Sequence, residues 1–217
     1  MDSFLNQLPF MNKLPPQARE QAMRNFVLRK YAKGAFIFEE GDPPDAVYLV
    51  RSGLVKVMKY SAGAEPVAME LIVPGGLFGM AAVLDKKPFP VSTRTLSPAE
   101  IYSIPAPLFE SMLKTYPAFS QEVFTDMGNH LRHSQTLRSM ALKPVEKRIA
   151  YILFLLHSLI GKDLPVRRED VAEMAGSTVG TSIRTLADFR KQKLISSGWK
   201  RITVLNPSGL QKLAESE

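Results

Sequence analysis

REDVAEMAGSTVGTSIRTL, residues 168–186, is the stretch that decides the fold of the second half of the chain. Its acidic residues at 169–170 lie in the first turn of a short predicted helix, where the helix dipole stabilises negative charge. Gly176 permits a tight turn, since glycine adopts backbone conformations that are costly for other residues. Ser177 or Thr178 can then cap a second helix. The stretch therefore predicts two short helices joined at a glycine.

The flanking sequence adds a helix before this pair and a hairpin after it. An apolar amphipathic helix is predicted from Pro144 to about Gly161. Residues 194–196 and 201–205 form a predicted β-hairpin, with residues 199–201 at its tip. This order of elements is typical of a winged helix-turn-helix, which binds DNA.

A domain of this type contacts DNA through its second helix and its wing. The second helix enters the major groove with its N-terminal end first, so its early side chains reach base edges. Basic side chains of the wing reach phosphates, which set affinity rather than sequence preference. Arg184 is the best candidate for binding either a base or a phosphate. The predicted DNA-binding residues are Thr178, Val179, Gly180, Thr181, Ser182, Arg184, Arg168, Lys200 and Arg201.

The charge of the chain is unevenly distributed, and it favours a polyanionic partner. The net charge of the chain is +7. Residues 1–137 hold 14 Lys and Arg against 13 Asp and Glu, a net of +1, whereas residues 138–217 hold 14 against 8, a net of +6. Positive charge confined to one domain is typical of a surface that binds double-stranded DNA.

The composition also excludes several classes of site. The chain has no cysteine, which excludes disulfides, thiolate metal sites, iron–sulfur clusters and cysteine nucleophiles. No apolar run is long enough to span a membrane, because the longest, 149–160, is interrupted by His157 and Ser158. Residues 1–4 show no signal-peptide pattern. A cytoplasmic protein without membrane contact is the simplest expectation.

The first half of the chain is predicted to be β-rich. Segments rich in branched and aromatic residues alternate with turn formers at a spacing of roughly ten residues, which is typical of an antiparallel barrel or jelly roll. A helix from Pro15 to Phe26 is expected before them. The predicted strands are 36–38, 47–50, 54–57, 67–73 and 100–104.

A long helix is predicted to start near Pro117 and to join the two halves. Its residues follow the alternating steps of four and three that are typical of a coiled-coil seam. The helix packs either on its own domain or on a second copy of itself. The seam comprises Val123, Met127, His130, Ser134, Leu137 and Ala141, and the predicted dimer contacts are Val123, Met127, Leu131 and Leu137. The predicted domains are 1–116 (effector-sensing β-barrel), 117–142 (dimerisation helix and hinge) and 143–217 (DNA-binding domain).

Motifs in both halves resemble those of the cyclic-AMP receptor protein and fumarate–nitrate regulator family. Residues 33–42 resemble the first strand and turn of the family's β-domain, 47–57 its central hairpin, and 74–79 the approach to its ligand-binding loop. The resemblance covers about residues 15–205. The matching helix-turn-helix residues are Ala172, Gly176, Thr178, Thr181, Arg184 and Leu186, followed by Lys193, Leu194 and Ile195.

The resemblance implies both a fold and a function. The fold is α+β, with an N-terminal antiparallel jelly roll of the cyclic-nucleotide-binding type, a long dimerisation helix and a C-terminal winged helix-turn-helix. The function is that of a homodimeric transcription regulator, expected to act as an activator with RNA polymerase on a palindromic operator. The recognition helix departs from the family, because Val179 and Gly180 stand where Arg or Pro and then Glu are usual. The family's consensus half-site is therefore not expected here.

The expected effector pocket departs from the nucleotide-binding members. Those members bind ribose with a Gly-Glu pair and the cyclic phosphate with an Arg-Ser pair. Here Gly79 is retained, Met80 replaces the Glu, and Pro90-Val91 fall at the Arg-Ser position. Cyclic AMP is therefore not the expected effector. The candidate pocket residues are Gly79, Met80, Val91, Ser92, Arg94, His130, His133 and Ser134.

The residue types present exclude one other effector chemistry, iron–sulfur sensing, and leave another, haem, open. Iron–sulfur sensing is excluded, since it needs cysteine. Haem needs an axial ligand, and the candidates are Met80 and the pair His130 and His133, one turn apart. The same side chains also fit a packed methionine and polar groups that line a pocket or a dimer seam. No metal site and no catalytic residues are predicted.

Three functions remain as candidates. The first is a regulator that is controlled by a small-molecule, redox or gas signal in the N-terminal barrel. The second is the same DNA-binding scaffold without a small-molecule effector, either constitutive or regulated by a protein. The third is a cupin-like enzyme, which is disfavoured because such enzymes need histidines inside the barrel and residues 1–129 contain none.

Overall fold

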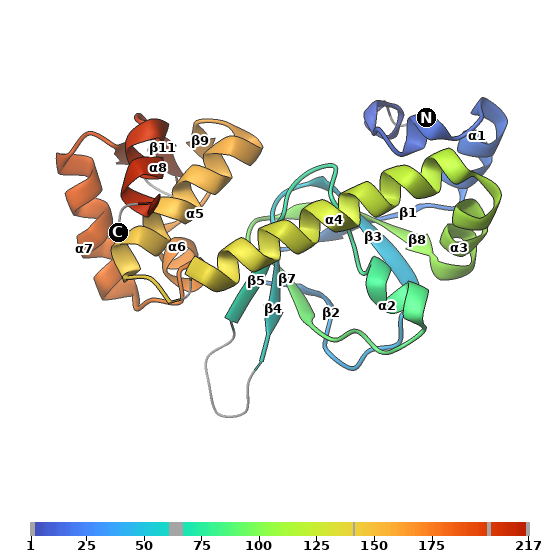
Figure 1. The fold of residues 1–217 in the computed structure, drawn as a ribbon, viewed down its shortest axis with the longest axis horizontal. Coiled ribbons are helices and arrows are strands. Elements are labelled where there is room, and N and C mark those ends of the chain that lie inside the picture. The colour runs from blue at the N-terminus through green and yellow to red at the C-terminus, as the bar shows by residue number, and fades with distance from the viewer. Residues whose placement is uncertain (1–2, 61–66, 141, 199–200, 216–217) are drawn as a thin grey trace. The chain divides into compact units, whose positions relative to one another are not determined.

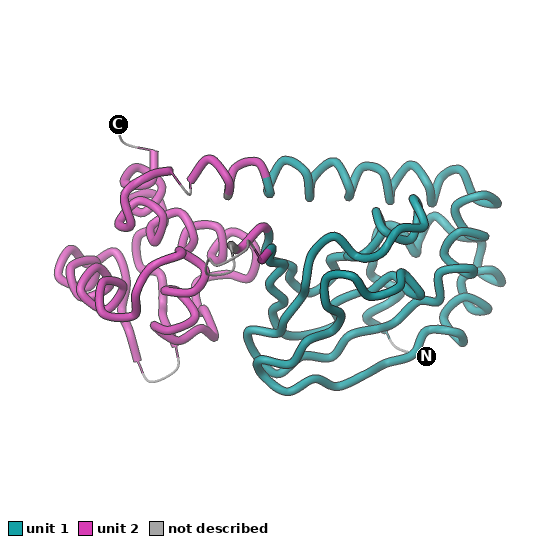
Figure 2. The backbone as a smooth tube through the Cα atoms, turned by 90° about the horizontal axis from the view of Figure 1, so that it is seen from below, with its two compact units in different colours: residues 1–59, 70–134 teal, residues 60–69, 135–217 magenta. Residues whose placement is uncertain are grey.

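The structure is a computed structural model that describes residues 3–60, 67–140, 142–198 and 201–215. The chain forms two compact units, one of residues 1–59 and 70–134 and one of residues 60–69 and 135–217 (Figure 2). Among the described residues, no helix combines the length and the hydropathy that crossing a bilayer requires.

Among the described residues, eight strands form the β-structure of the N-terminal half of the chain (Figure 1). They are β1 (Val27–Tyr31), β2 (Phe36–Phe38), β3 (Ala46–Ser52), β4 (Val55–Lys59), β5 (Val67–Ile72), β6 (Leu77–Phe78), β7 (Ser92–Thr95) and β8 (Ala99–Pro105). One sheet has the order β1-β8-β3-β6 and the other the order β2-β7-β4-β5. The antiparallel jelly roll that the sequence predicts is confirmed.

Three of these strands escape the sequence analysis, each for a local reason. β1 is mostly exposed and lacks the alternation of a half-buried strand. β6 has only two residues. β7 has the sequence Ser-Thr-Arg-Thr, whose residues are polar although most of them are buried. Strand patterns in sequence depend on apolar alternation, so these strands give little signal.

Helices pack against the jelly roll and contribute side chains to its hydrophobic core. They are η1 (Leu5–Gln7), η2 (Met11–Lys13), α1 (Pro16–Arg24), α2 (Met80–Asp85), α3 (Ala106–Thr115) and α4 (Pro117–Met140). Phe119 on α4 makes edge-to-face contacts with Phe10 and Phe109, at ring distances of 6.1 and 6.0 Å. The N-terminal segment, α3 and the start of α4 therefore share one hydrophobic core with β3 and β8.

The second unit contains the winged helix-turn-helix that the sequence predicts. Its elements are α5 (Val145–Ile160), β9 (Asp163–Leu164), α6 (Arg168–Met174), α7 (Val179–Lys191), β10 (Ile195–Gly198), β11 (Arg201–Val204) and α8 (Pro207–Glu215). The strand order is β10-β11-β9. α8 packs on α5 and buries Leu210. The sequence analysis predicts neither β9 nor α8.

Candidate DNA interface and signal-sensing site

The turn between α6 and α7 is built by two residues that the sequence analysis identifies. Gly176 has φ +56°, a left-handed conformation that disfavours side chains. The Thr178 side chain accepts a hydrogen bond from the Thr181 N–H at 3.2 Å and so caps α7. These two features fix where α7 begins and which of its faces turns outward.

One face of α7 is buried in the domain and the opposite face is exposed. Ser182, Leu186 and Phe189 follow at steps of four and three and are almost fully buried. Ser182 has no solvent exposure, so its assignment as a DNA-contacting residue is wrong. Helical phasing explains the error, because the residue lies on the same face as Leu186.

The outer face of α7 carries a cation and two apolar side chains. Val179 and Ile183 are 41% and 38% exposed, which suits contact with thymine methyl groups. The Arg184 guanidinium donates to the Thr181 hydroxyl at 3.3 Å, which directs it toward the N-terminal end of α7. Gly180 is also exposed, and a Cβ placed there would meet no atom within 4 Å. Sequence analysis missed Ile183, which the phase of the buried face identifies.

A cleft of about 510 Å³ lies between the start of α6 and the β10–β11 hairpin. Arg167, Arg168, Glu169 and Arg201 line it, together with Val166, Ser197, Gly198 and Ile202. Arg168 and Arg201 are among the predicted DNA-binding residues. Lys200 lies outside the described residues. Among the described lining residues, three arginines against one glutamate give this cleft a net positive charge.

The segment between α2 and β7 is fixed by aromatic packing. Phe89 stacks on Phe38 at a ring distance of 3.7 Å, and both are almost fully buried. Gly79 has φ +84°, and a Cβ there would approach Phe89 to 3.1 Å. Tyr48 joins the cluster, and burial, followed by the charge of Asp45, raises its pKa to about 12. The Pro90-Val91 position of the expected pocket therefore adjoins a packed apolar cluster.

The other barrel candidates are distributed between core and sheet. Met80 belongs to the hydrophobic core of the first unit, which favours the alternative of a packed methionine. The Ser92 hydroxyl accepts from the Glu40 N–H at 2.9 Å. Arg94 on β7 is directly opposite Lys56 on β4, so both cationic side chains project from one face of the sheet. Lys56 has no solvent exposure, and sequence analysis did not single it out.

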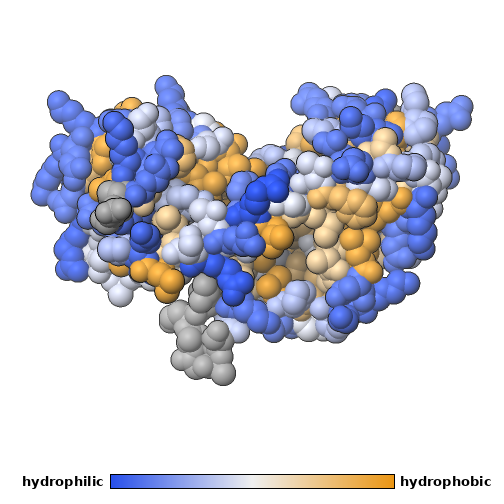
Figure 3. Space-filling view, in the orientation of Figure 1, coloured by the Kyte–Doolittle hydropathy of each residue, from blue (hydrophilic) through white to orange (hydrophobic). Residues whose placement is uncertain are grey.

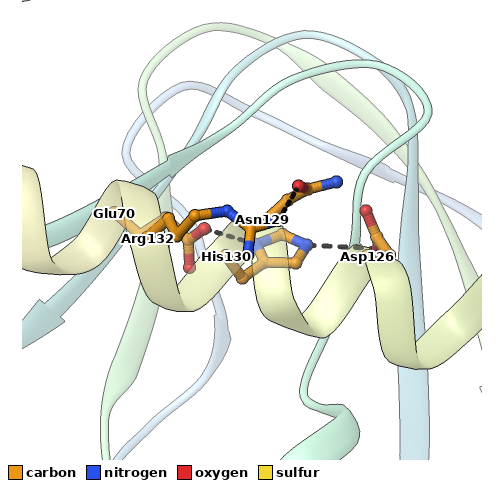
Figure 4. Close-up of polar contacts among 5 residues, drawn as sticks. All are labelled: Glu70, Asp126, Asn129, His130 and Arg132. Carbon is orange, nitrogen blue, oxygen red and sulfur yellow. Dashed lines mark hydrogen bonds and ion pairs between the residues drawn. The ribbon is translucent and has the colours of Figure 1, made fainter.

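His130 forms the centre of an ion cluster that joins α4 to the β-sheet (Figure 4). Its Nδ1 contacts the Glu70 carboxylate on β5, and its Nε2 lies 3.3 Å from an Asp126 oxygen. Both ring nitrogens face acceptors, so both must donate, which requires the imidazolium form. Burial would lower the pKa of His130, but the hydrogen bonds to Asp126 and Glu70 outweigh it and raise the pKa from 6.5 to about 10.

The structure does not place His130 and His133 together at one binding site. His133 is exposed, whereas His130 is engaged by its two carboxylates. In the described part of the chain, no group of three or more His, Cys, Asp and Glu side chains could hold a metal ion. The histidine pair therefore gives no support to a haem or metal interpretation.

The predicted dimer contacts on α4 differ from its exposed apolar residues. Val123 has no solvent exposure because it packs in its own core, so its assignment to the dimer interface is wrong. Met127 is partly buried against the same core. Phe124 and Leu131 are instead 56% and 61% exposed, with Gly128 between them. Of the predicted dimer contacts, Leu131 keeps an exposed position, and the side chain of Leu137 lies outside the described residues.

Phe124 also borders a second cleft of the first unit. This cleft, about 550 Å³, lies between α2, α3 and the start of α4, and Leu84 and Leu113 line it as well. Apolar side chains gather on the visible face around α4 and α2 (Figure 3). The exposed apolar surface of α4 therefore continues onto a neighbouring element.

Comparison with known proteins identifies both units. The family described as "Cyclic nucleotide-binding domain" matches residues 28–116, and "Crp-like helix-turn-helix domain" matches residues 147–213. A relative named "Cyclic AMP receptor protein", from Thermus thermophilus, is 25% identical over 208 residues, which cover 95% of this chain and 96% of the relative. "Transcriptional activator protein Anr" from Pseudomonas protegens is 27% identical over 195 residues, which cover 86% of this chain and 80% of the relative.

A solved structure shows the same fold over most of the chain. FixK2 from Bradyrhizobium japonicum has a TM-score of 0.78 at 18% identity, covering 88% of this chain and 98% of its own. At that identity the likeness shows the fold alone, and the family assignment rests on the two matched domains and their order. The chain belongs to the CRP/FNR family of DNA-binding transcription regulators.

Proposed function

We propose that this regulator works as a homodimer in the cytoplasm, binds a palindromic operator and activates transcription with RNA polymerase. The observation that carries the proposal is the outer face of α7, where Arg184 is oriented by Thr181 beside two exposed apolar side chains. A relative named as a transcriptional activator supports activation rather than repression.

A selection of bound fragments from randomised duplex DNA tests this function. The enriched sequences are expected to be palindromic, because two identical domains read two half-sites. Arg184→Ala should lose base preference at one half-site position, whereas Arg168→Ala should weaken binding to all sequences. A selection that enriches no common sequence would contradict the proposal.

We also propose that a small-molecule, redox or gas signal in the barrel, other than cyclic AMP, controls DNA binding. The packed apolar cluster beside Pro90 supports the exclusion of cyclic AMP, since a cyclic phosphate needs a cation and hydrogen-bond donors there. The alternative is a scaffold without a small-molecule effector. Mass spectrometry of the purified dimer separates the two, because a retained molecule that changes DNA affinity supports the signal-controlled form.

A further inference from the structure

The wing of the second unit carries three polar side chains on one face of its sheet. Arg201 and Thr203 alternate along β11 and so share a face, and Thr203 is the register partner of Asp163 on β9. Ile202, Leu164 and Val204 are almost fully buried on the opposite side. The sheet therefore presents Arg201, Thr203 and Asp163 together outside the core.

These three side chains form a chain of hydrogen bonds. The Thr203 hydroxyl donates to Asp163 Oδ1 at 2.9 Å, and the Arg201 guanidinium donates to the same oxygen at 2.8 Å. Hydrogen bonds from Arg201 and then from Thr203 lower the pKa of Asp163, so the carboxylate stays ionised. Arg201 is a long side chain that is well exposed, and this anchor holds its guanidinium in place.

Arg201 also lines the cleft of about 510 Å³ against the start of α6. Arg167 and Arg168 also line the cleft, and Glu169 is the one carboxylate among those lining residues that the structure describes. Asp163 is not among the lining residues that the structure describes, and it accepts a hydrogen bond from one nitrogen of Arg201. Because a guanidinium has five N–H donors, Arg201 keeps donors for an anion in the cleft.

We infer that Asp163 is a positioning residue, which holds Arg201 in place for its predicted contact with a phosphate of the DNA backbone. The inference rests on the proposed DNA-binding function and adds the residue that orients its wing contact. An arginine that is already held in its bound position loses less side-chain entropy on binding. The negative charge of Asp163 is offset by Arg201 itself, so the cleft keeps a net positive lining.

Binding to a mixed-sequence 30-base-pair duplex at several KCl concentrations tests the inference, since phosphate contacts need no particular sequence. Asp163→Asn removes the charge and keeps the size of the side chain. We expect it to weaken binding about threefold, although removing a negative charge from a DNA-binding domain would otherwise strengthen binding. Thr203→Val, which removes only the hydroxyl that anchors Asp163, should act in the same direction with a smaller effect.

Two controls separate positioning from charge and from folding. Asp188→Asn removes a carboxylate of the same domain that is paired with Lys191 and is more exposed than Asp163, and it should leave affinity unchanged or raise it. Arg201→Ala should reduce the magnitude of the negative slope of log K against log[KCl] by about 0.9. Asp163→Asn should then have no further effect in the Arg201→Ala protein. The circular dichroism and melting curve of each variant show whether it folds.

Each outcome decides a different claim. Asp163→Asn binding as tightly as the wild type or more tightly, or an equal loss with and without Arg201, overturns the positioning role. An unchanged salt slope in Arg201→Ala overturns the phosphate contact. A wild-type protein that binds no duplex at low salt contradicts the proposed function itself, and the inference with it.

Discussion

His130 shows how one side chain can depend on residues far away in the sequence. Its imidazolium lies between Asp126, one turn earlier on α4, and Glu70 on β5. The folded state holds the proton more tightly than an unfolded chain, in which the pKa is about 6.5. The cluster therefore stabilises the fold in a pH-dependent manner.

The pH dependence has a definite sign. Because the pKa is raised from 6.5 to about 10 on folding, the stabilisation is complete below pH 6.5 and disappears as the pH rises through about 10. His130→Gln should lower the free energy of unfolding at pH 6 by on the order of 2 kcal/mol. Between pH 6 and pH 10 this free energy should also decrease less in the variant than in the wild type. Urea unfolding at several pH values measures this. His133→Gln, one turn away and exposed, should follow the wild type; equal curves for all three proteins would refute the role of the cluster.

A second residue-scale prediction concerns Gly180. A methyl group there would meet nothing within 4 Å, so packing within the protein does not require glycine. Gly180→Ala should therefore raise stability by about 1 kcal/mol, because alanine favours helix. If the glycine lets the backbone approach DNA, the variant should also bind the selected operator at least about tenfold more weakly. Thermal melting and a mobility shift measure the two effects, and unchanged affinity would mean that DNA does not require the glycine.

Individual residues were predicted well where the signal is local. Gly176 and Thr178 act as expected, because turn and cap chemistry depends on near neighbours. Ser182 is misassigned as a DNA-contacting residue, since its burial depends on how whole elements pack. The partners of His130 could not be predicted at all, because Glu70 lies 60 positions away.

α4 shows the same limit at the scale of an element. Its length and start agree with the sequence, since Pro117 favours the first turn of a helix. The predicted seam instead follows the face that packs on the first unit, so Val123 is buried there. A period of about 3.5 residues identifies a stripe, but it does not say whether the chain itself or a second copy covers that stripe.

The exposed apolar residues of α4 predict which substitutions separate a dimer. Leu131→Asp should raise the dissociation constant of the dimer at least about tenfold, because two unpaired charges would meet in the interface. Phe124→Asp should raise the dissociation constant of the dimer in the same way. Thr125→Asp is the matched control, since Thr125 is exposed and lies off the line through Phe124, Gly128 and Leu131. Light scattering at micromolar concentration measures the mass; a Leu131→Asp protein that stays dimeric would show that the interface lies elsewhere.

At the scale of the molecule, the order of the domains followed from sequence, whereas the chemistry of the signal did not. The jelly roll and the winged helix both carry repeated local patterns, and these determine the architecture. The effector pocket expected from the sequence would depend instead on side chains from several strands and from α4. Lys56, buried opposite Arg94, illustrates this, because no pattern in its own strand distinguishes it from an exposed lysine.

Cyclic AMP should bind this protein only weakly. Each polar group of the nucleotide left without a partner costs on the order of 1–3 kcal/mol, and Met80 and Pro90-Val91 provide none of the usual partners. Calorimetric titration should therefore give a dissociation constant above about 100 µM. The Thermus thermophilus relative named for cyclic AMP is the positive control. Low-micromolar binding that also tightens DNA binding would overturn the exclusion.

The shared core of the first unit sets the order in which a nascent chain can complete it. Phe10 packs on Phe119, and Leu5, Leu8 and Met11 belong to the same cluster as Val123. These apolar residues must therefore wait until the start of α4 has been synthesised. Since chains grow at about 5–20 residues per second, these side chains stay uncovered for several seconds. During that interval the N-terminal segment is a target for chaperones and for aggregation.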